Sequence, residues 1–187
     1  MHYSNLVIIE TTDDVEKAVE QAMGASEDQG GFWDWYQIGG RWTGVLDGYE
    51  PDEDPRNVEE CFCCGGTGFR NDAIGKQARE REPSYTCNGC GDIKDGKWTH
   101  GKHGPGKHTS WSYAKHPGDI APIDTLTEEA YGRFYRIVTP YARTFGGDEY
   151  MPWKETGECF KRREKPPLDW LKKEYEGHIV VVVDNHS

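Results

Sequence analysis

Two Cys-x-x-Cys pairs constrain the fold of this chain more than any other feature of its sequence. The four residues are Cys61, Cys64, Cys87 and Cys90. They lie in residues 61–116, a stretch that is poor in aliphatic side chains and rich in Gly, His and Lys. Because this stretch has no apolar run able to form a core, a bound metal has to supply its folding free energy. The pairs therefore predict a metal-stapled lobe.

The spacing of the cysteines indicates which metal to expect. Two residues between ligands let both thiolates of a pair face one point, and two such knuckles complete a tetrahedron. Four thiolates leave no position for water, so the spacing predicts one structural zinc ion rather than a catalytic one. Cys63 breaks the two-residue spacing and is expected not to be a ligand, and Cys159 is expected to be an isolated buried side chain.

The first knuckle resembles a repeat of the DnaJ-type zinc domain. Residues 61–68 read Cys-Phe-Cys-Cys-Gly-Gly-Thr-Gly and fit the pattern Cys-x-x-Cys-x-Gly-x-Gly, whereas residues 87–92 keep both cysteines but lack the second glycine. The resemblance covers residues 61–92, about one and a half repeats, and the J-domain signature is absent. It implies a zinc knuckle and not a chaperone.

Charge and length limit the class of protein. The 187 residues suit one domain with a sizeable insertion, and the net charge is −11. Residues 1–60 carry 15 Asp/Glu against 3 Lys/Arg, which disfavours wrapping around DNA, whereas residues 61–116 carry 9 Lys/Arg against 5 Asp/Glu. No transmembrane run and no signal peptide are recognisable, so we expect a cytoplasmic protein. In that compartment, paired cysteines more often bind metal than form disulfides.

Hydrophobic periodicity predicts an α+β fold. We expect strands at residues 5–10, 134–139 and 178–184, a hairpin at 35–46 around two glycines, helices at 12–24, 126–131 and 167–175, and an acidic linker at 47–60. Without residues 61–116, this order matches a ferredoxin-like split β-α-β sandwich with a zinc lobe inserted between the second and third strands. The expected domains are residues 1–60 with 117–187, a discontinuous α+β domain, and the inserted lobe 61–116.

Residues 32–42, FWDWYQIGGRW, gather five aromatic residues, an aspartate and an arginine around a double glycine. One interpretation is a ligand pocket, in which aromatic rings stack on a base and an arginine binds phosphate or carboxylate. The other is a core hairpin in which Arg41 pairs with Asp34. The candidate ligand-binding residues are Trp33, Trp35, Tyr36, Arg41 and Trp42.

The same stretch, with the C-terminal strand, resembles a group of small uncharacterised proteins of bacteriophages and actinobacteria. These proteins share a WY-x-x-GGRW-x-G segment, a strand that ends near VTP, and a terminal VVD-x-H. The matching positions are Trp35, Tyr36, Gly39, Gly40, Arg41, Trp42, Gly44, Thr139, Pro140, Asp184 and His186. The resemblance skips the zinc lobe and implies a phage or prophage origin, but no reaction. If the chain is phage-encoded, the cytoplasm in which we expect it is that of the host.

Two groups of histidines are further candidates for a metal or acid–base site. His100, His103, His108 and His116 lie in a Gly/Lys-rich stretch that reads either as a second metal site or as a solvated loop. If the last strand runs antiparallel to the first, His186 lies near His2. With Asp184, these two histidines could bind metal or transfer protons, or simply be solvated.

Three functions remain open on these observations. The first is a zinc-containing, phage-type accessory binding protein that engages a host protein or a nucleotide-like ligand, with counter-defence as one such role. The second is a nucleic-acid binder that uses the basic stretch 61–116, including Lys102 and Lys107. The third is a hydrolase of a nucleotide or phosphate ester that uses Arg41, Asp184 and His186. No P-loop, Ser-His-Asp order, HExxH motif or Rossmann fingerprint supports the third, so no catalytic residue is assigned.

Overall fold

The computed structural model describes residues 2–27, 33–110, 116–140, 144–150, 160–162 and 164–186. Contacts divide the chain into two compact units. We call Met1–Tyr49 with Ala114–Ser187 the sheet unit, and Glu50–Tyr113 the cysteine unit.

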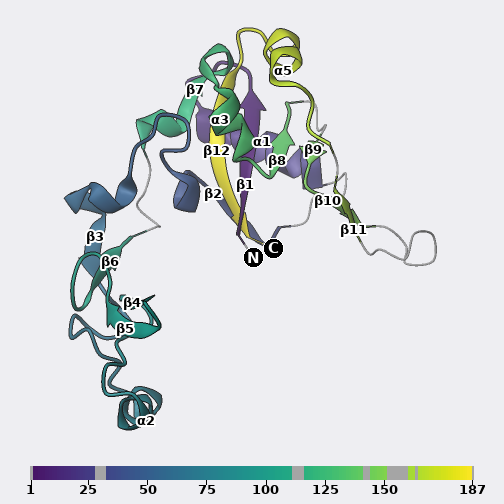
Figure 1. The fold of residues 1–187 in the computed structure, drawn as a ribbon. Helices are drawn as coiled ribbons and strands as arrows, with labels where there is room; N and C mark the ends of the chain where they lie inside the picture. The colour runs from purple at the N-terminus through teal and green to yellow at the C-terminus, as the bar shows by residue number, and fades with distance from the viewer. Residues whose placement is uncertain are drawn as a thin grey trace. The chain divides into compact units, whose positions relative to one another are not determined.

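The sheet unit is built on one mixed β-sheet with the strand order β2-β12-β1-β8-β9, and β7 pairs with the start of β12 (Figure 1). Its strands are β1 (His2–Ile9), β2 (Trp35–Ile38), β7 (Ile120–Pro122), β8 (Arg136–Val138), β9 (Thr144–Gly146) and β12 (Ile179–His186). β1 and β12 pair antiparallel over their whole length, whereas β1 and β8 are parallel. A separate antiparallel pair joins β10 (Asp148–Tyr150) to β11 (Phe160–Arg162).

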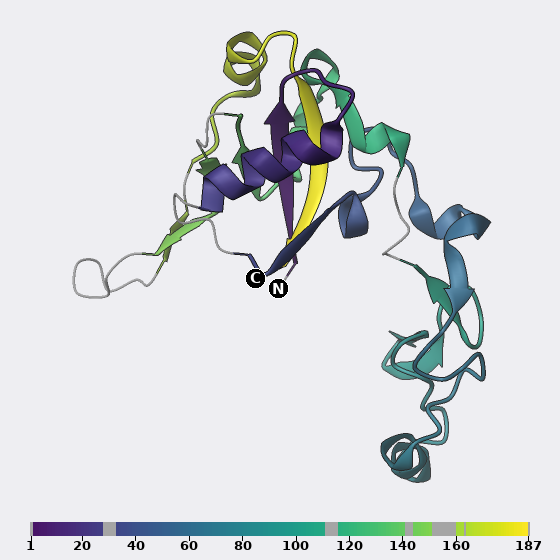
Figure 2. The ribbon, with the colours of Figure 1, turned by 180° about the vertical axis from the view of Figure 1, so that it is seen from behind.

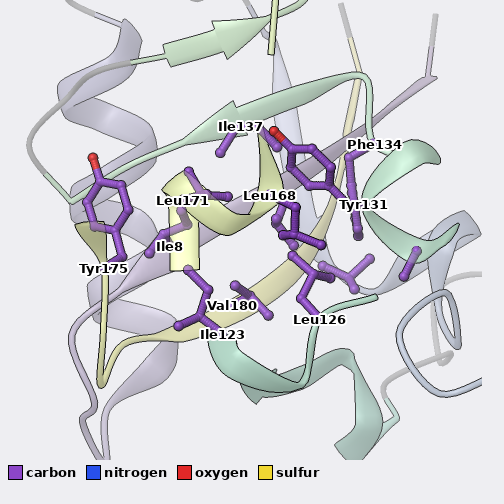
Figure 3. Packing of buried hydrophobic residues seen from close by; sticks show 13 residues of the cluster. Ile8, Ile123, Leu126, Tyr131, Phe134, Ile137, Leu168, Leu171, Tyr175 and Val180 are labelled. Carbon is purple, nitrogen blue, oxygen red and sulfur yellow. The ribbon is translucent and has the colours of Figure 1, made fainter. Parts of the chain in front are cut away.

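Helices cover both faces of this sheet. They are α1 (Val15–Glu27), α3 (Glu128–Gly132) and α5 (Leu168–Glu174), and short 3-10 turns occupy Gly40–Trp42, Pro117–Asp119 and Ile123–Thr125. Side chains alternate along a strand, so Leu6 and Ile8 pack under α3 and α5, as Figure 3 shows for Ile8. Val7 and Ile9 pack on the opposite face, with side chains of α1. Figure 2 shows α1 lying across that face of the sheet. β1 and β12 are therefore the fully buried strands that their apolar runs predict.

The predicted α+β class is confirmed, but the ferredoxin-like arrangement is not. That arrangement requires a β-α-β-β-α-β order, which would use a hairpin as its middle strands. Here β12 lies between β1 and β2, so β2 extends the sheet beyond its last strand. The place of the expected middle hairpin, beside β1 on its other edge, is taken by β8 and β9, which pair antiparallel. Both strands follow the cysteine unit in the chain.

The hairpin predicted for residues 35–46 is wrong. The partner of β2 is β12, which pairs Ile38 with Val183. Both glycines have positive φ, 73° at Gly39 and 61° at Gly40, but they lead into a 3-10 turn instead of a second strand. The reason is tertiary, because the Gly39 N–H donates to the Val182 carbonyl at 2.8 Å and so holds the turn on β12.

The cysteine unit contains two short antiparallel ribbons and one helix. Its elements are β3 (Val58–Glu60), α2 (Ala73–Arg81), β4 (Gly91–Lys94), β5 (Lys97–His100) and β6 (Lys107–Thr109), with 3-10 turns at Pro51–Glu53 and Pro55–Asn57. β3 pairs with β6, and β4 pairs with β5. The acidic stretch 47–60, predicted to be a linker, is thus partly structured, since its last three residues form β3.

A buried carboxylate in the sheet unit, that of Asp119, fixes the segment that follows the 3-10 turn Gly40–Trp42. Asp119 is inaccessible to solvent and accepts hydrogen bonds from the Thr43 hydroxyl at 3.0 Å and the Gly44 N–H at 2.8 Å. The His116 N–H donates to the same carboxylate at 3.2 Å. Burial raises the pKa of Asp119 above its ordinary value of 3.8, although these donors oppose the shift.

The raised pKa of Asp119 gives a signed pH dependence. The folded state binds this proton more tightly than the unfolded chain, so its contribution to stability is present below pH 3.8 and is lost as pH rises through the folded pKa. We therefore expect Asp119→Asn to gain stability relative to wild type as pH rises from 3.8 through the folded pKa of Asp119. Urea unfolding of both proteins across this range measures the difference, and a difference that does not vary with pH would contradict the assignment.

Candidate metal centre

The four cysteines of the two pairs converge on one point inside the cysteine unit. All are buried, and their Sγ atoms lie within 4.8 Å of one another. Cys61 and Cys87 approach to 3.8 Å between sulfurs, and Cys64 and Cys90 to 3.7 Å. A tetrahedral zinc bound at about 2.3 Å places its sulfur ligands roughly 3.8 Å apart. The cluster therefore has the dimensions of a metal site.

Each cysteine pair is a tight turn that the local sequence favours. The Gly65 N–H donates to the Cys61 carbonyl at 2.8 Å, and the Gly91 N–H donates to the Cys87 carbonyl at 2.5 Å. Such turns bring residues i and i+3 to the same side of the backbone. The two thiol groups of each pair therefore face the same point.

Backbone N–H groups also point at the sulfurs. Gly68 donates to Cys64 Sγ and Gly89 donates to Cys87 Sγ, both at 3.3 Å. Glycine at position 89 has a steric reason as well, because a Cβ there would lie 2.8 Å from Cys63 Sγ. Gly68, the last glycine of the DnaJ-like pattern, thus donates to one sulfur, and Gly89 donates to another and leaves room beside Cys63.

The ribbons hold the two turns against each other. The Cys61 N–H, directly after β3, donates to the Gly106 carbonyl at 2.8 Å. The Cys87 N–H donates to the Gly68 carbonyl at 2.9 Å, which links the second turn to the segment after the first. These bonds connect parts of the chain that are far apart in sequence, so the cluster is positioned by the whole unit.

The environment of the thiols is one in which a cation would be favourable. Burial raises the pKa of the Cys61 thiol far above its ordinary value, and raises the pKa of Cys90 to about 11. At Cys64 burial acts in the same direction, but the Gly68 N–H and the neighbouring sulfurs outweigh it and lower the pKa. A bound divalent cation deprotonates coordinating thiols and compensates their buried charge.

Cys63 and the neighbouring histidines lie outside this cluster. Cys63 is exposed, in agreement with its predicted role as a bystander, while Cys159 falls outside the described residues. His103 Nε2 lies 2.9 Å from the Thr109 hydroxyl, and His108 Nδ1 lies 2.8 Å from the Thr109 carbonyl. Across the described ranges, the four cysteines are the sole cluster of three or more potential ligands, so the second metal site considered for these histidines is not formed there.

His116 belongs to the sheet unit and has a different role. Its Nε2 lies 2.6 Å from the Asp47 carboxylate, and its ring stacks on Tyr49 at a centroid distance of 4.0 Å. The sheet unit leaves off at Tyr49 and resumes at Ala114. The contacts of His116 with Asp47 and Tyr49 therefore join the two segments of the sheet unit that flank the cysteine unit in the sequence.

The structure does not bring the five predicted ligand-binding residues into one pocket. Trp33 is buried in the core under α1, and Trp42 packs on the opposite face of the sheet. Tyr36 lines a surface hollow of about 670 Å³ with α1, whose other lining residues include Glu16 and Glu20. Those carboxylates disfavour an anionic nucleotide. Trp35 and Arg41 are exposed.

The C-terminal candidates have partners that the sequence did not reveal. His2 does lie beside His186, as expected, with ring centroids 5.2 Å apart. Asp184, however, pairs with His2 rather than with His186, and Asp34 pairs with His186 rather than with Arg41. The antiparallel register of the first and last strands can be predicted from sequence, but the position of Asp34 beside His186, which follows from the pairing of β2 with β12, cannot.

Comparison of the chain with protein-family models, with curated proteins and with solved structures gives no match. Within the described residues, every helix is too short or too polar to cross a membrane.

Proposed function

We propose that this chain is a zinc-containing binding protein, in which the cysteine unit is a lobe inserted into the sheet unit and stapled by one zinc ion. The convergence of four buried sulfurs carries the proposal. Four cysteines fill a tetrahedral shell and leave no open position for substrate, which favours a structural role.

The need for a metal follows from what the cysteine unit buries. Its one hydrophobic cluster among the described residues consists of the four cysteines themselves. The larger apolar clusters belong to strands and helices of the sheet unit. A small unit without an apolar core requires a metal or a disulfide to be stable. One zinc ion per chain is the expected result of elemental analysis.

The same unit displays apolar side chains to solvent. Phe62 is 84% exposed, Ile74 61% and Ile93 57%, and they make up three of the five large exposed hydrophobic residues in the described ranges. Phe62 stands between two cysteine ligands, so metal binding would fix its backbone. We propose that Phe62, the most exposed of them, contacts a protein partner, because a fixed aromatic side chain can anchor an interface. Given the resemblance to bacteriophage proteins, a host protein is the partner that we propose.

Nucleic acid is less well supported as a partner, because acidic residues accompany the lysines of this unit. Lys102 lies 3.6 Å from the Glu53 carboxylate, and Lys107 pairs across the β3–β6 ribbon with Glu60. Phosphate binding needs an uncompensated positive surface. If the chain does bind nucleic acid, its affinity should fall steeply with salt and on removal of both lysines.

A photo-reactive phenylalanine analogue at position 62 tests the proposal in host cells. We expect one discrete protein adduct, abolished by zinc chelation, and no such adduct from the same analogue at Trp170 in the sheet unit. With the adduct identified, Phe62→Ala should weaken its affinity by about 1–2 kcal/mol, or roughly 5–30-fold. A nuclease-sensitive adduct would favour the nucleic-acid alternative, and equal adducts at both positions would refute Phe62 as the contact residue.

A further inference from the structure

One end of the sheet in the sheet unit carries a set of polar side chains that the proposed binding function does not use. β1 and β12 lie side by side there (Figure 1), and their register pairs His2 with His186. β12 in turn pairs His186 with Trp35 of β2. Directly opposed residues share a face, and Asp184, two residues from His186, shares it too. Four chemically active side chains thus form one patch.

Each histidine of this patch is oriented by a carboxylate. His2 Nδ1 lies 3.0 Å from Asp184 Oδ1, and His186 Nδ1 lies 2.8 Å from Asp34 Oδ1. Asp184 is completely buried and also accepts a hydrogen bond from the Arg41 N–H at 3.2 Å. A carboxylate that accepts from Nδ1–H fixes the tautomer in which Nε2 carries the lone pair. In the described part of the chain, neither Nε2 atom has a hydrogen-bond partner.

The separation of the two ring centres matches that of imidazoles that share a metal ion. Their centroids are 5.2 Å apart, with an interplanar angle of 70°. Two imidazoles bound to one tetrahedral zinc at about 2.0–2.1 Å have ring centres roughly 5 Å apart. Trp35 restrains both rings, since it stacks on His186 at 5.8 Å and meets His2 edge-on at 5.3 Å.

We propose that the Nε2 atoms of His2 and His186 bind one divalent transition-metal ion, such as Zn²⁺ or Co²⁺, at this end of the sheet. Imidazole ligands select such metals over Mg²⁺ and Ca²⁺. Asp184 and Asp34 are the outer-shell carboxylates that orient the ligands. Two protein ligands leave further positions to water, and metal-bound water is the nucleophile of many hydrolases. This centre is chemically distinct from the closed cysteine cluster.

Cobalt titration of the full chain, already carrying one zinc, tests the proposal. Co²⁺ should bind with d–d absorption bands but without the sulfur-to-cobalt charge-transfer band that entry into the cysteine site would produce. His186→Ala should abolish this binding, whereas His100→Ala, in the cysteine unit, should leave it intact. Asp34→Asn keeps both ligands and should weaken binding about 10–100-fold.

The outcomes separate the possibilities cleanly. An absence of Co²⁺ binding by the zinc-loaded wild type, binding unchanged by His186→Ala, or binding lost with His100→Ala would each overturn the site. Near-ultraviolet circular dichroism verifies that the variants are folded. Asp34 is exposed, so its substitution tests the arrangement even if His186→Ala fails to fold. Failure here would leave the cysteine-site zinc content, and with it the proposed function, unaffected.

Discussion

Cys87→Ser is expected to unfold the cysteine unit and to leave the sheet unit folded. Cys87 is fully buried and its sulfur lies 3.8 Å from that of Cys61, so its loss removes one of four proposed zinc ligands. Structural zinc contributes about 10–16 kcal/mol of binding free energy in small metal-dependent folds. Nothing else in the described cysteine unit buries enough apolar surface to replace it. The sheet unit keeps its own two apolar clusters.

Hydrogen exchange of the full chain, read together with zinc content, measures this effect. Amides of β3 to β6 should lose protection in Cys87→Ser, while those of β1 and β12 should keep it. Cys63→Ser is the matched control, because it removes a neighbouring exposed thiol that lies outside the cluster. Zinc loss in the control, or retained protection of the ribbons in Cys87→Ser, would contradict the assignment of ligands.

Local patterns in this sequence predicted local structure well. The apolar runs at residues 5–10 and 178–184 correspond to β1 and β12, and the proline before α5 stands at its start. The cysteine spacing predicted the turns and the convergence of the four sulfurs. In these cases the interactions that decide the structure lie within a few residues of one another. For the two strands, a short continuous apolar run bounded by polar residues is typical of a strand buried on both faces.

Long-range pairing could not be predicted in the same way. The double glycine of residues 39–40 has the positive φ that a hairpin turn needs, but β12 offers β2 a partner that is already buried. The choice between Arg41 and His186 as partner of Asp34 depends on that same pairing, because it brings His186 opposite Trp35. The aromatic residues of this stretch likewise separate once the strand is placed, since Trp33 and Tyr36 pack with one core cluster and Trp42 with the other.

The double glycine at residues 39–40 is also expected to be important for the stability of the sheet unit. Gly40→Ala is expected to lower the unfolding free energy of the sheet unit by about 2–5 kcal/mol. Left-handed backbone, with φ of 61° here, costs roughly 1–2 kcal/mol for alanine, and overpacking adds about 1–3. The added Cβ would lie 2.6 Å from Asp184 Cβ and 2.5 Å from Gln37 Nε2. The GGRW turn is thus pressed against the buried carboxylate that orients His2.

Gly48→Ala provides the matched control for this crowding. Gly48 also has positive φ, 79°, but a Cβ there meets no heavy atom within 4 Å. It should therefore cost only the backbone strain, about 1–2 kcal/mol. Exchange of the β12 amides, which report opening of the whole sheet unit, measures both variants on one scale. If the two variants are equally destabilised, glycine 40 is required for backbone conformation alone. A larger loss in Gly40→Ala means that close contact with Asp184 is what requires a glycine there.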